Sequence, residues 1–313
     1  MAKCLVLGAN GLIGCYVVDK LAAEGHTVRA FDRYSSEVVN YNSSKKVEKF
    51  VGDFLNSYDL KTALKGIDYV FHFISTTTPI TSENDPSIDI ETNIRMSVEL
   101  MQLCVDAKVK RILFPSTGGA IYGTLDDGDI RSYNETDLTL PVSPYAIGKL
   151  TIENYLRYFS VKFGLDYVNF RISNPFGIKQ SQNSKQGVIP IFFDKILNDQ
   201  PITVFGDGSM ERDYIYVEDV AEMIVAMFNK KHRYDTYNIG SGESSSVNEI
   251  VAIIEEVTGK KAKVIRKATP VTFLDKVQLD VGRYKQEFGH VSKYTVKSGI
   301  QAMYDTIMRS HEK

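Results

Sequence analysis

The residues best suited to chemistry are a tyrosine and a lysine four positions apart, Tyr145 and Lys149. Apolar residues recur with helical spacing as far as Phe163, and Ser143-Pro144 suits a helix start, so the pattern predicts one helix. Residues four apart share a helix face, which brings the phenol and the ammonium together. Because a nearby positive charge favours the phenolate, we expect Lys149 to lower the pKa of Tyr145 and make it an acid/base.

Such a pair also occurs by chance in many helices, and it needs a redox cofactor to act with. A short apolar run, residues 3–7, leads into glycines at 8, 11 and 14 and then into a helical pattern. These glycines permit a tight turn and close approach to a pyrophosphate, which free amides at the helix start can bind. The predicted dinucleotide turn comprises Gly8, Asn10, Gly11, Leu12, Ile13 and Gly14.

A predicted second strand, residues 27–31, ends in Asp32. Dinucleotide-binding folds carry an acidic residue about 20 positions after the glycines, where it binds the ribose hydroxyls. Asp32 would repel a 2'-phosphate, which favours NAD over NADP. Arg33 weakens this preference, because an arginine can accept that phosphate or cover the adenine. We expect NAD, with NADP as the less favoured cofactor.

Strand and helix patterns then alternate, which predicts a doubly wound parallel sheet. The predicted strands and helices, in chain order, are 49–51, 60–64, 69–74, 90–107 and 111–115. Ligands in such sheets bind at the carboxyl ends of the strands, which is where Ser75, Ser116 and Thr117 fall.

Composition narrows the class of protein. The 313 residues carry a net charge of -2 and dispersed basic residues, which gives no footprint for nucleic acid or an anionic membrane. Three separated cysteines and five scattered histidines predict neither a disulfide framework nor a metal site. Because no apolar run approaches the ~18 residues of a membrane span, we expect a cytoplasmic protein.

Motifs along nearly the whole chain resemble the extended short-chain dehydrogenases/reductases, and among them the NAD-dependent nucleotide-sugar epimerase/dehydratase family. In order they are the glycine trio, Asp32, Gly52-Asp53, Val70-Phe71-His72, Asn93, Ser116-Thr117 with Tyr122-Gly123, Tyr145/Lys149, Asn174-Pro175-Phe176-Gly177, and Gly206-Asp207-Gly208 leading to Arg212-Asp213-Tyr214. The resemblance implies an α/β Rossmann fold with a smaller mixed α/β substrate domain. Residues 1–177 and about 214–240 would bind NAD, and residues 178–213 and 241–313 the nucleotide sugar.

The resemblance also implies roles for single residues. Tyr145 would be the acid/base at a sugar hydroxyl, Lys149 would bind the nicotinamide ribose, and Thr117 or Ser116 would orient that hydroxyl. We prefer Thr117, although the Gly118-Gly119 pair lengthens this loop relative to the commoner family form. The other implied cofactor contacts are Asp53, Phe54, Phe73, Ser75 and Asn93, and the substrate contacts are Ser116, Thr117, Asn174, Val188 and Arg212. An ordinary polar loop explains Ser75 equally well.

The implied reaction is C4 epimerisation of a UDP-hexose, UDP-glucose/UDP-galactose or the N-acetyl counterparts, through a transient 4-keto sugar. A 4,6-dehydratase would carry an Asp-Glu pair where Gly118 and Gly119 stand, and a 3,5-epimerase/reductase would need a cysteine that the Ser116 loop lacks. A 4-ketoreductase of a nucleotide 4-keto-6-deoxysugar remains the alternative. A cofactor sensor without catalysis is more distant, because Tyr145 and Lys149 are both present.

Two further expectations come from the resemblance. The arginine expected about ten residues before Val277-Gln278-Leu279-Asp280 falls on Pro270, so Arg266, Lys267 or Lys276 would replace it on the diphosphate. The family commonly dimerises through the helices at 93–107 and 145–163, so we expect a homodimer.

Overall fold

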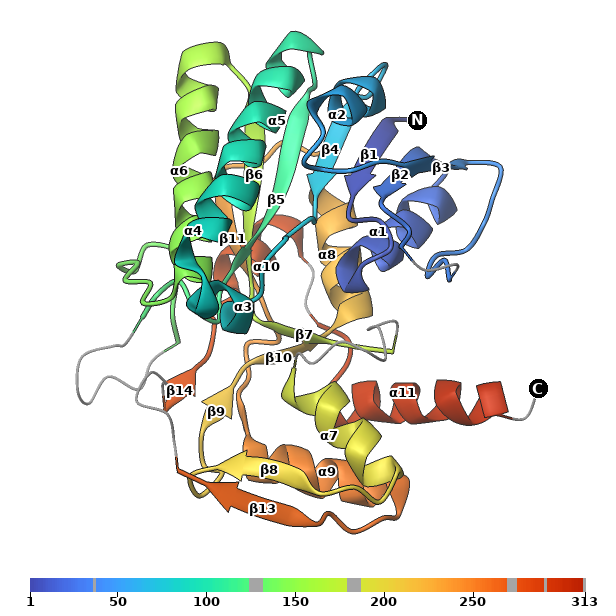
Figure 1. Ribbon diagram of the computed structural model, residues 1–313, viewed down its shortest axis with the longest axis vertical. Coiled ribbons are helices and arrows are strands. Elements are labelled where there is room, and N and C mark those ends of the chain that lie inside the picture. The colour runs from blue at the N-terminus through green and yellow to red at the C-terminus, as the bar shows by residue number, and fades with distance from the viewer. Residues whose placement is uncertain (36–37, 124–131, 179–186, 269–274, 290–291, 312–313) are drawn as a thin grey trace.

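The computed structural model describes residues 1–35, 38–123, 132–178, 187–268, 275–289 and 292–311 (Figure 1). Its largest element is a seven-stranded sheet in the order β11-β6-β5-β4-β1-β2-β3, with parallel pairing between all neighbours. The strands are β1 (Lys3–Leu7), β2 (Thr27–Asp32), β3 (Val47–Val51), β4 (Tyr69–His72), β5 (Arg111–Thr117), β6 (Asp166–Ile172) and β11 (Thr236–Ile239). This is the doubly wound Rossmann sheet that the sequence predicts.

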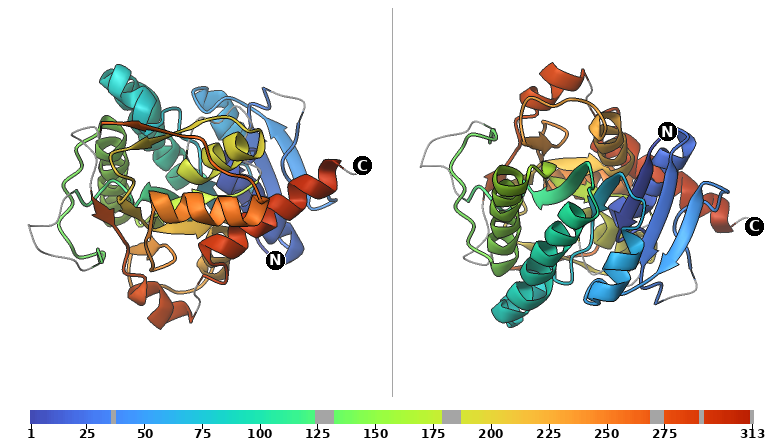
Figure 2. Two further views of the ribbon diagram at one scale, coloured as in Figure 1. Left: turned by 90° about the horizontal axis from the view of Figure 1, so that it is seen from below. Right: turned by 90° about the horizontal axis from the view of Figure 1, so that it is seen from above.

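Both faces of the sheet are covered, which explains the continuous apolar runs of its strands. In β1, Cys4 and Val6 face one core cluster, whereas Leu5 and Leu7 face the other. Helices α1 and α8 cover the first face, and α2, α5 and α6 cover the second, as the view from above in Figure 2 shows. The helices of this part are α1 (Leu12–Ala23), α2 (Ser57–Ala63), α3 (Pro79–Asn84), α4 (Pro86–Ile88), η1 (Asp89–Ile94), α5 (Arg95–Asp106), α6 (Pro144–Phe163), α8 (Val217–Met227) and α10 (Gly282–Phe288).

The edge strand β11 joins the sheet from far along the chain. It pairs with β6, within the segment of about 214–240 that the resemblance assigns to the NAD-binding part. Arg111 of β5 joins the start of β6 to the end of α8, because its guanidinium donates to Asp166 at 2.8 Å and to the carbonyls of Phe228 and Lys230, both at 2.8 Å.

A smaller group of elements lies below the sheet in Figure 1 and has its own apolar core, with Phe176, Phe192, Phe193, Ile250 and Ile300 among its members. None of the helices in the described ranges is long and apolar enough to cross a membrane. The elements are β7 (Asn174–Phe176) with β10 (Tyr214–Tyr216), β8 (Ile202–Phe205) with β13 (Val264–Lys267), β9 (Glu211–Arg212) with β12 (Ser245–Ser246) and β14 (Lys276–Val277), and helices α7 (Val188–Leu197), α9 (Val247–Thr258) and α11 (Val296–His311).

The predicted continuous helix over 90–107 is wrong at its beginning. The chain forms the π-helical segment η1 before α5 takes regular α-helical form. Asp89 and Asn93 both face inward from this segment, where the Asn93 amide donates to the Asp89 carboxylate at 2.7 Å. Single π turns inside helices often occur at functional sites.

Candidate active site

The glycine turn between β1 and α1 has the geometry of a dinucleotide site. Gly8 has a φ of +80°, which favours glycine, and a side chain at Gly14 would place its Cβ 2.1 Å from the Gly8 carbonyl oxygen. Helix α1 begins at Leu12, followed by Ile13, and no side chain caps it at Gly11. Its first amides are therefore available to a phosphate, as the fold requires for a dinucleotide.

Asp32 lies at the end of β2 beside this turn. Its carboxylate accepts hydrogen bonds from the Asn10 amide at 3.0 Å and the Arg33 amide at 2.8 Å, while the Arg33 side chain is exposed. The Asn10 side chain donates to the Val38 carbonyl at 2.9 Å and accepts from the Asn40 amide at 2.7 Å. The Asn10 carbonyl also accepts from the Asn40 side chain at 2.7 Å, so both the side chain and the backbone of Asn10 are bonded within the protein.

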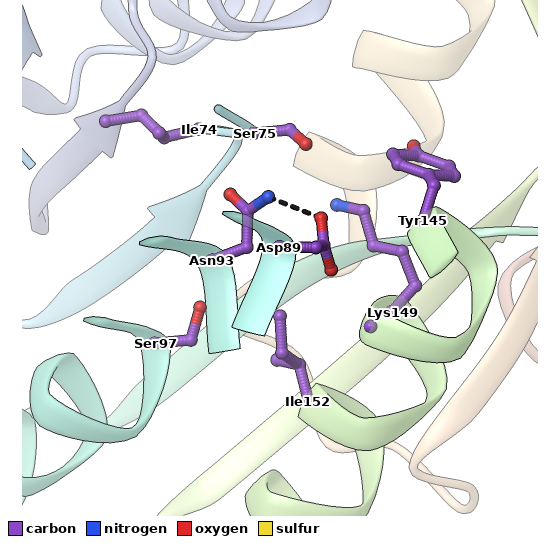
Figure 3. A pocket seen from close by; sticks show the side chains of 9 residues that line it. Ile74, Ser75, Asp89, Asn93, Ser97, Tyr145, Lys149 and Ile152 are labelled. Carbon is purple, nitrogen blue, oxygen red and sulfur yellow. Dashed lines mark hydrogen bonds between the residues drawn. The ribbon is translucent and has the colours of Figure 1, made fainter. Parts of the chain in front are cut away.

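Helix α6 brings Tyr145 and Lys149 together as predicted. Ser143 caps the helix, accepting from the Ala146 amide at 3.3 Å, and Pro144 opens it. The Lys149 ammonium donates to the carbonyl of Pro115 in β5 at 2.9 Å and lies 5.7 Å from the centre of the Tyr145 ring. Figure 3 shows both side chains rising from one helix face into the same pocket.

The protonation of this pair differs from the prediction. Burial lowers the pKa of Lys149 to about 8, against the opposing effect of the Asp89 and Glu153 carboxylates. Burial and the charge of Asp89 raise the pKa of Tyr145 to about 12. The expected lowering of the Tyr145 pKa is thus wrong for the protein alone, because desolvation disfavours a buried phenolate and the charge of Asp89, which acts on it, is negative.

Asn93 holds the loop that follows β4. Its carbonyl oxygen accepts from the Thr76 amide at 2.9 Å, and its amide nitrogen donates to the Thr77 hydroxyl at 2.8 Å as well as to Asp89. Ser75, in the same loop, is exposed and donates to the Thr77 carbonyl at 2.8 Å. Ser75 and Asn93 line one pocket with Tyr145 and Lys149 (Figure 3).

Asp89 is the residue of this pocket that the sequence analysis missed. It is 3% exposed and lies against Gly148 of α6. The available signal was Gly148 itself, because a glycine inside a helical pattern often marks a close approach.

A second buried group beneath the pocket is His72, at the end of β4. Its Nε2 lies 2.8 Å from the Ser97 hydroxyl. Burial and the charge of Lys149 lower the pKa of His72 to about 3, so the ring is neutral in the folded protein.

A buried ion pair, also missed, anchors the far side of α6. The guanidinium of Arg171 in β6 donates to the Glu153 carboxylate at 2.8 and 3.2 Å and to the Tyr122 hydroxyl at 3.2 Å. This pair fixes the helix that carries Tyr145 and Lys149 to the central sheet.

Ser116 and Thr117 are the last two residues of β5, so their side chains point to opposite sides of the strand. The Ser116 hydroxyl is buried without a hydrogen-bond partner, and Thr117 is half-buried. A Cβ at Gly118 would lie 2.5 Å from Leu279 and 2.9 Å from the Arg171 carbonyl oxygen. No acidic side chain fits at position 118 without rearrangement.

Three further expected cofactor contacts are partly committed to the protein. The Asp53 carboxylate accepts from the Leu55 amide at 2.9 Å, and Phe54 is buried with its ring 5.1 Å from that of His72. Phe73 is half-buried and stacks on Phe71. The phenyl ring of Phe54 is therefore not available to a cofactor.

The expected substrate residues Asn174, Val188 and Arg212 line a second pocket of about 270 Å³. Helix α7 begins at Val188 without a side-chain cap, so its first amides are free. The Arg212 guanidinium donates to the Glu211 carbonyl at 2.7 Å, and its charge has no carboxylate within 4.0 Å in the described part of the chain. Burial lowers the pKa of Arg212.

Tyr214 completes the second pocket and was not expected there. Its ring is 5% exposed, and its buried hydroxyl has no hydrogen-bond partner. A buried hydroxyl without a partner costs free energy, which a ligand oxygen in this pocket would recover.

Pro270, on which the second expected arginine falls, lies outside the described residues. Among the possible substitutes, Arg266 donates to the Gly206 carbonyl at 3.2 Å, and Lys267 ends β13. Lys276 lies on β14 beside Arg212, but its ammonium pairs with Glu211 at 2.9 Å. None of the three lines the second pocket.

The glycine turn, the parallel sheet and the tyrosine-lysine pair define a dinucleotide-dependent enzyme of the extended short-chain dehydrogenase/reductase class. The chain belongs to the NAD-dependent epimerase/dehydratase family, whose model matches residues 4–240. The predicted family and its cofactor, NAD, are thereby confirmed.

Similar proteins carry out related reactions. A dTDP-4-dehydro-6-deoxyglucose reductase of Escherichia coli is 29% identical, over 97% of this chain and 96% of the relative. A UDP-glucose 4-epimerase of Mycolicibacterium smegmatis is 29% identical, over 95% of this chain and 96% of the relative. The crystal structure of UDP-glucose 4-epimerase from Thermotoga maritima with UDP-glucose superimposes with a TM-score of 0.91 at 31% identity, covering 99% of each chain.

Proposed function

We propose that this enzyme interconverts the C4 epimers of a UDP-hexose, either UDP-glucose and UDP-galactose or their N-acetyl counterparts. The observation that carries the proposal is the pocket that Tyr145 and Lys149 line together with Ser75 and Asn93, two of the expected cofactor contacts. The likeness to the Thermotoga maritima epimerase with UDP-glucose supports the choice of substrate. The lack of room at Gly118 argues against a 4,6-dehydratase.

In this reaction Tyr145 accepts the proton of the C4 hydroxyl and returns it after the 4-keto sugar has turned over. When bound, NAD would supply the complementary hydride chemistry, in which the C4 hydrogen leaves with its electron pair and later returns to the other face of the keto sugar. Lys149, held by the Pro115 carbonyl, binds the nicotinamide ribose and supplies positive charge near the phenol. Thr117 orients the C4 hydroxyl, with Ser116 as the alternative because its hydroxyl has no partner. Positioning of the sugar supplies much of the remaining rate.

The second pocket binds the UDP part of the substrate. A guanidinium and a free helix N-terminus both favour phosphate oxygens, and Arg212 and the start of α7 provide these in one place. Residues 1–177 and 214–240 then serve as the NAD-binding domain, and residues 178–213 and 241–313 as the nucleotide-sugar domain. The sugar would lie between Asn174 and Tyr145.

The enzyme acts as a homodimer in this proposal. Along α6, Ile147, Tyr155, Tyr158 and Val161 are exposed, with Val161 at 83%. A second copy would cover this apolar stripe, as expected for the helices at 93–107 and 145–163. Light scattering on the purified protein measures the mass directly, and a monomer at micromolar concentration contradicts this part of the proposal.

Proton NMR of the purified protein with UDP-glucose, and separately with UDP-N-acetylglucosamine, tests the reaction. No nicotinamide is added at first, because an epimerase regenerates its cofactor. Appearance of the anomeric signal of the galacto epimer supports the proposal and identifies the sugar. No change with either substrate, even after NAD is supplied, refutes it.

The second candidate is a 4-ketoreductase of a nucleotide 4-keto-6-deoxysugar, favoured by the likeness to the Escherichia coli reductase. It uses the same Tyr145 and Lys149. Consumption of NADH or NADPH in the presence of such a keto sugar, at a rate above any epimerisation, would decide for it.

A further inference from the structure

Asp89 is a buried carboxylate with few partners. One of its oxygens accepts from the Thr77 hydroxyl at 2.5 Å and from the Asn93 amide at 2.7 Å. In the described residues, no lysine or arginine nitrogen lies within 4.0 Å of it, so its charge is not neutralised by an ion pair. Burying a charge without a counter-ion is costly, so its position calls for a reason.

The second oxygen of Asp89 occupies a notch in helix α6. An ideal Cβ on Gly148 would lie only 1.8 Å from this oxygen, so the carboxylate stands where any other side chain would begin. Gly148 lies between Tyr145 and Lys149 on the helix, and a glycine inside a helix weakens it. The helix therefore gives up stability at the one place that admits Asp89.

Several charged or titratable groups surround this carboxylate. Helix α6 contributes Tyr145 and Lys149, on which the charge of Asp89 acts directly, and Lys149 in turn interacts with Glu153 and the neutral His72. Glu153 is already compensated by the guanidinium of Arg171. Asp89 is thus the uncompensated negative charge that acts on the phenol; it raises the pKa of Tyr145 and opposes the lowering of the Lys149 pKa by burial.

We propose that Asp89 is a positioning residue whose carboxylate, seated in the notch of Gly148, holds Tyr145 as the neutral phenol and Lys149 as the ammonium until a positive charge enters the site. The inference rests on the proposed acid/base role of Tyr145. The nicotinamide ring is positive only in its oxidised form. When the ring is neutral, Asp89 would keep the proton on the phenol, so that Tyr145 is ready to donate when the keto sugar is present.

The test is a pH titration of tyrosinate absorbance on the complex with NAD in its oxidised form, read by stopped-flow pH jump before the protein unfolds. The chain has 18 tyrosines, so each titration is compared with the same protein carrying Y145F, and the difference is the curve of Tyr145. Because Asp89→Asn removes a nearby buried charge, the midpoint of the Tyr145 titration in this variant should lie about half a pH unit or more below that of the wild type. The matched control is Glu91→Gln, which removes an exposed carboxylate from the same π-helical segment and should leave the midpoint unchanged.

A midpoint in Asp89→Asn that equals that of Glu91→Gln, or lies above it, overturns the inference, even if the variant is less stable. Gly148→Ala tests the notch, because it displaces the carboxylate without removing it and should also lower the midpoint. If Asp89→Asn does not fold, Asp89→Ser is measured in the same way. The readout needs no sugar substrate, so it stands or fails independently of whether the enzyme epimerises a UDP-hexose.

Discussion

The two pockets differ in volume and in how many of their polar groups already have partners within the protein. The space between Tyr145, Lys149 and Asp89 is about 10 Å³, about one water molecule, and Asn93 and Lys149 there are bonded to protein groups. The pocket at Arg212 is about 270 Å³, and it holds a hydroxyl and helix amides without partners. The polar groups of the first pocket are thus already held in place by the protein, whereas those of the second are left for a ligand to bind.

The largest effect should come from breaking the first pocket. Removing the Tyr145 hydroxyl with Tyr145→Phe should lower kcat about 10²- to 10⁴-fold, because no other group takes the proton at C4. Steady-state kinetics and NAD binding measure this, and KM should change little. Tyr58→Phe, at a position on α2 that is 75% exposed and lies outside both pockets, is the control. Retained activity in Tyr145→Phe would remove the acid/base role.

Breaking the second pocket should change binding more than turnover. Arg212→Ala should raise KM roughly 10- to 100-fold, since a hydrogen bond to a charged group is lost, and kcat should fall less. Arg266→Ala is the contrast, because its guanidinium donates to the Gly206 carbonyl and does not line this pocket. An equal rise in KM for Arg266→Ala would show that it contacts the diphosphate and would blur the distinction between the two arginines.

Lowering the pH should destabilise the folded protein through His72, which lies beneath the first pocket. Since burial lowers its pKa from 6.5 to about 3, the unfolded chain binds a proton below pH 6.5 that the folded protein does not. The free energy of unfolding therefore decreases as the pH is lowered. The contribution of His72 to this decrease is about 2 kcal/mol between pH 7 and pH 5. Urea unfolding at both pH values, compared with His72→Gln, measures the share of His72.

His232 should change the stability with pH in the opposite direction to His72. Asp166 raises its pKa, so its protonation stabilises the fold at low pH and that contribution is lost as the pH rises. Removing His232 should make the loss of stability between pH 7 and pH 5 steeper, whereas removing His72 should make it shallower. Parallel pH dependences in wild type and His72→Gln would contradict the buried neutral ring.

The smallest effect should separate binding from stability in the second pocket. Tyr214→Phe removes a buried hydroxyl without a partner, so Tm of the protein without substrate should stay equal or rise while KM increases a few-fold. Tyr284→Phe is the matched control, since its buried hydroxyl donates to the Met223 carbonyl at 2.8 Å. That variant should lose about 1 kcal/mol of stability. A clear loss of stability in Tyr214→Phe would mean that its hydroxyl already has a partner.

Local patterns predicted most of the sheet and the pairing of Tyr145 with Lys149, because both follow from periodicity along the chain. The glycine spacing likewise predicted the turn before α1. The sequence analysis missed Asp89 and the Glu153–Arg171 pair, which are defined by contacts between distant segments. The pKa of Tyr145 was predicted in the wrong direction, because helical spacing gives the distance to Lys149 but neither the depth of burial nor the charge of Asp89.

The return of the chain to the sheet at β11 has a consequence during synthesis. Strand β6 has unpaired backbone groups until the chain has been made as far as Ile239, because its outer neighbour β11 comes after much of the smaller part in the sequence. The outer backbone groups of β11 are in turn bonded to side chains, since the Asn238 amide donates to Glu135 at 2.8 Å and the Thr236 carbonyl accepts from Arg283 at 3.0 Å. Open strand edges invite pairing with other chains. A chain that ends between β6 and β11 should therefore aggregate, whereas the chain that includes β11 should not.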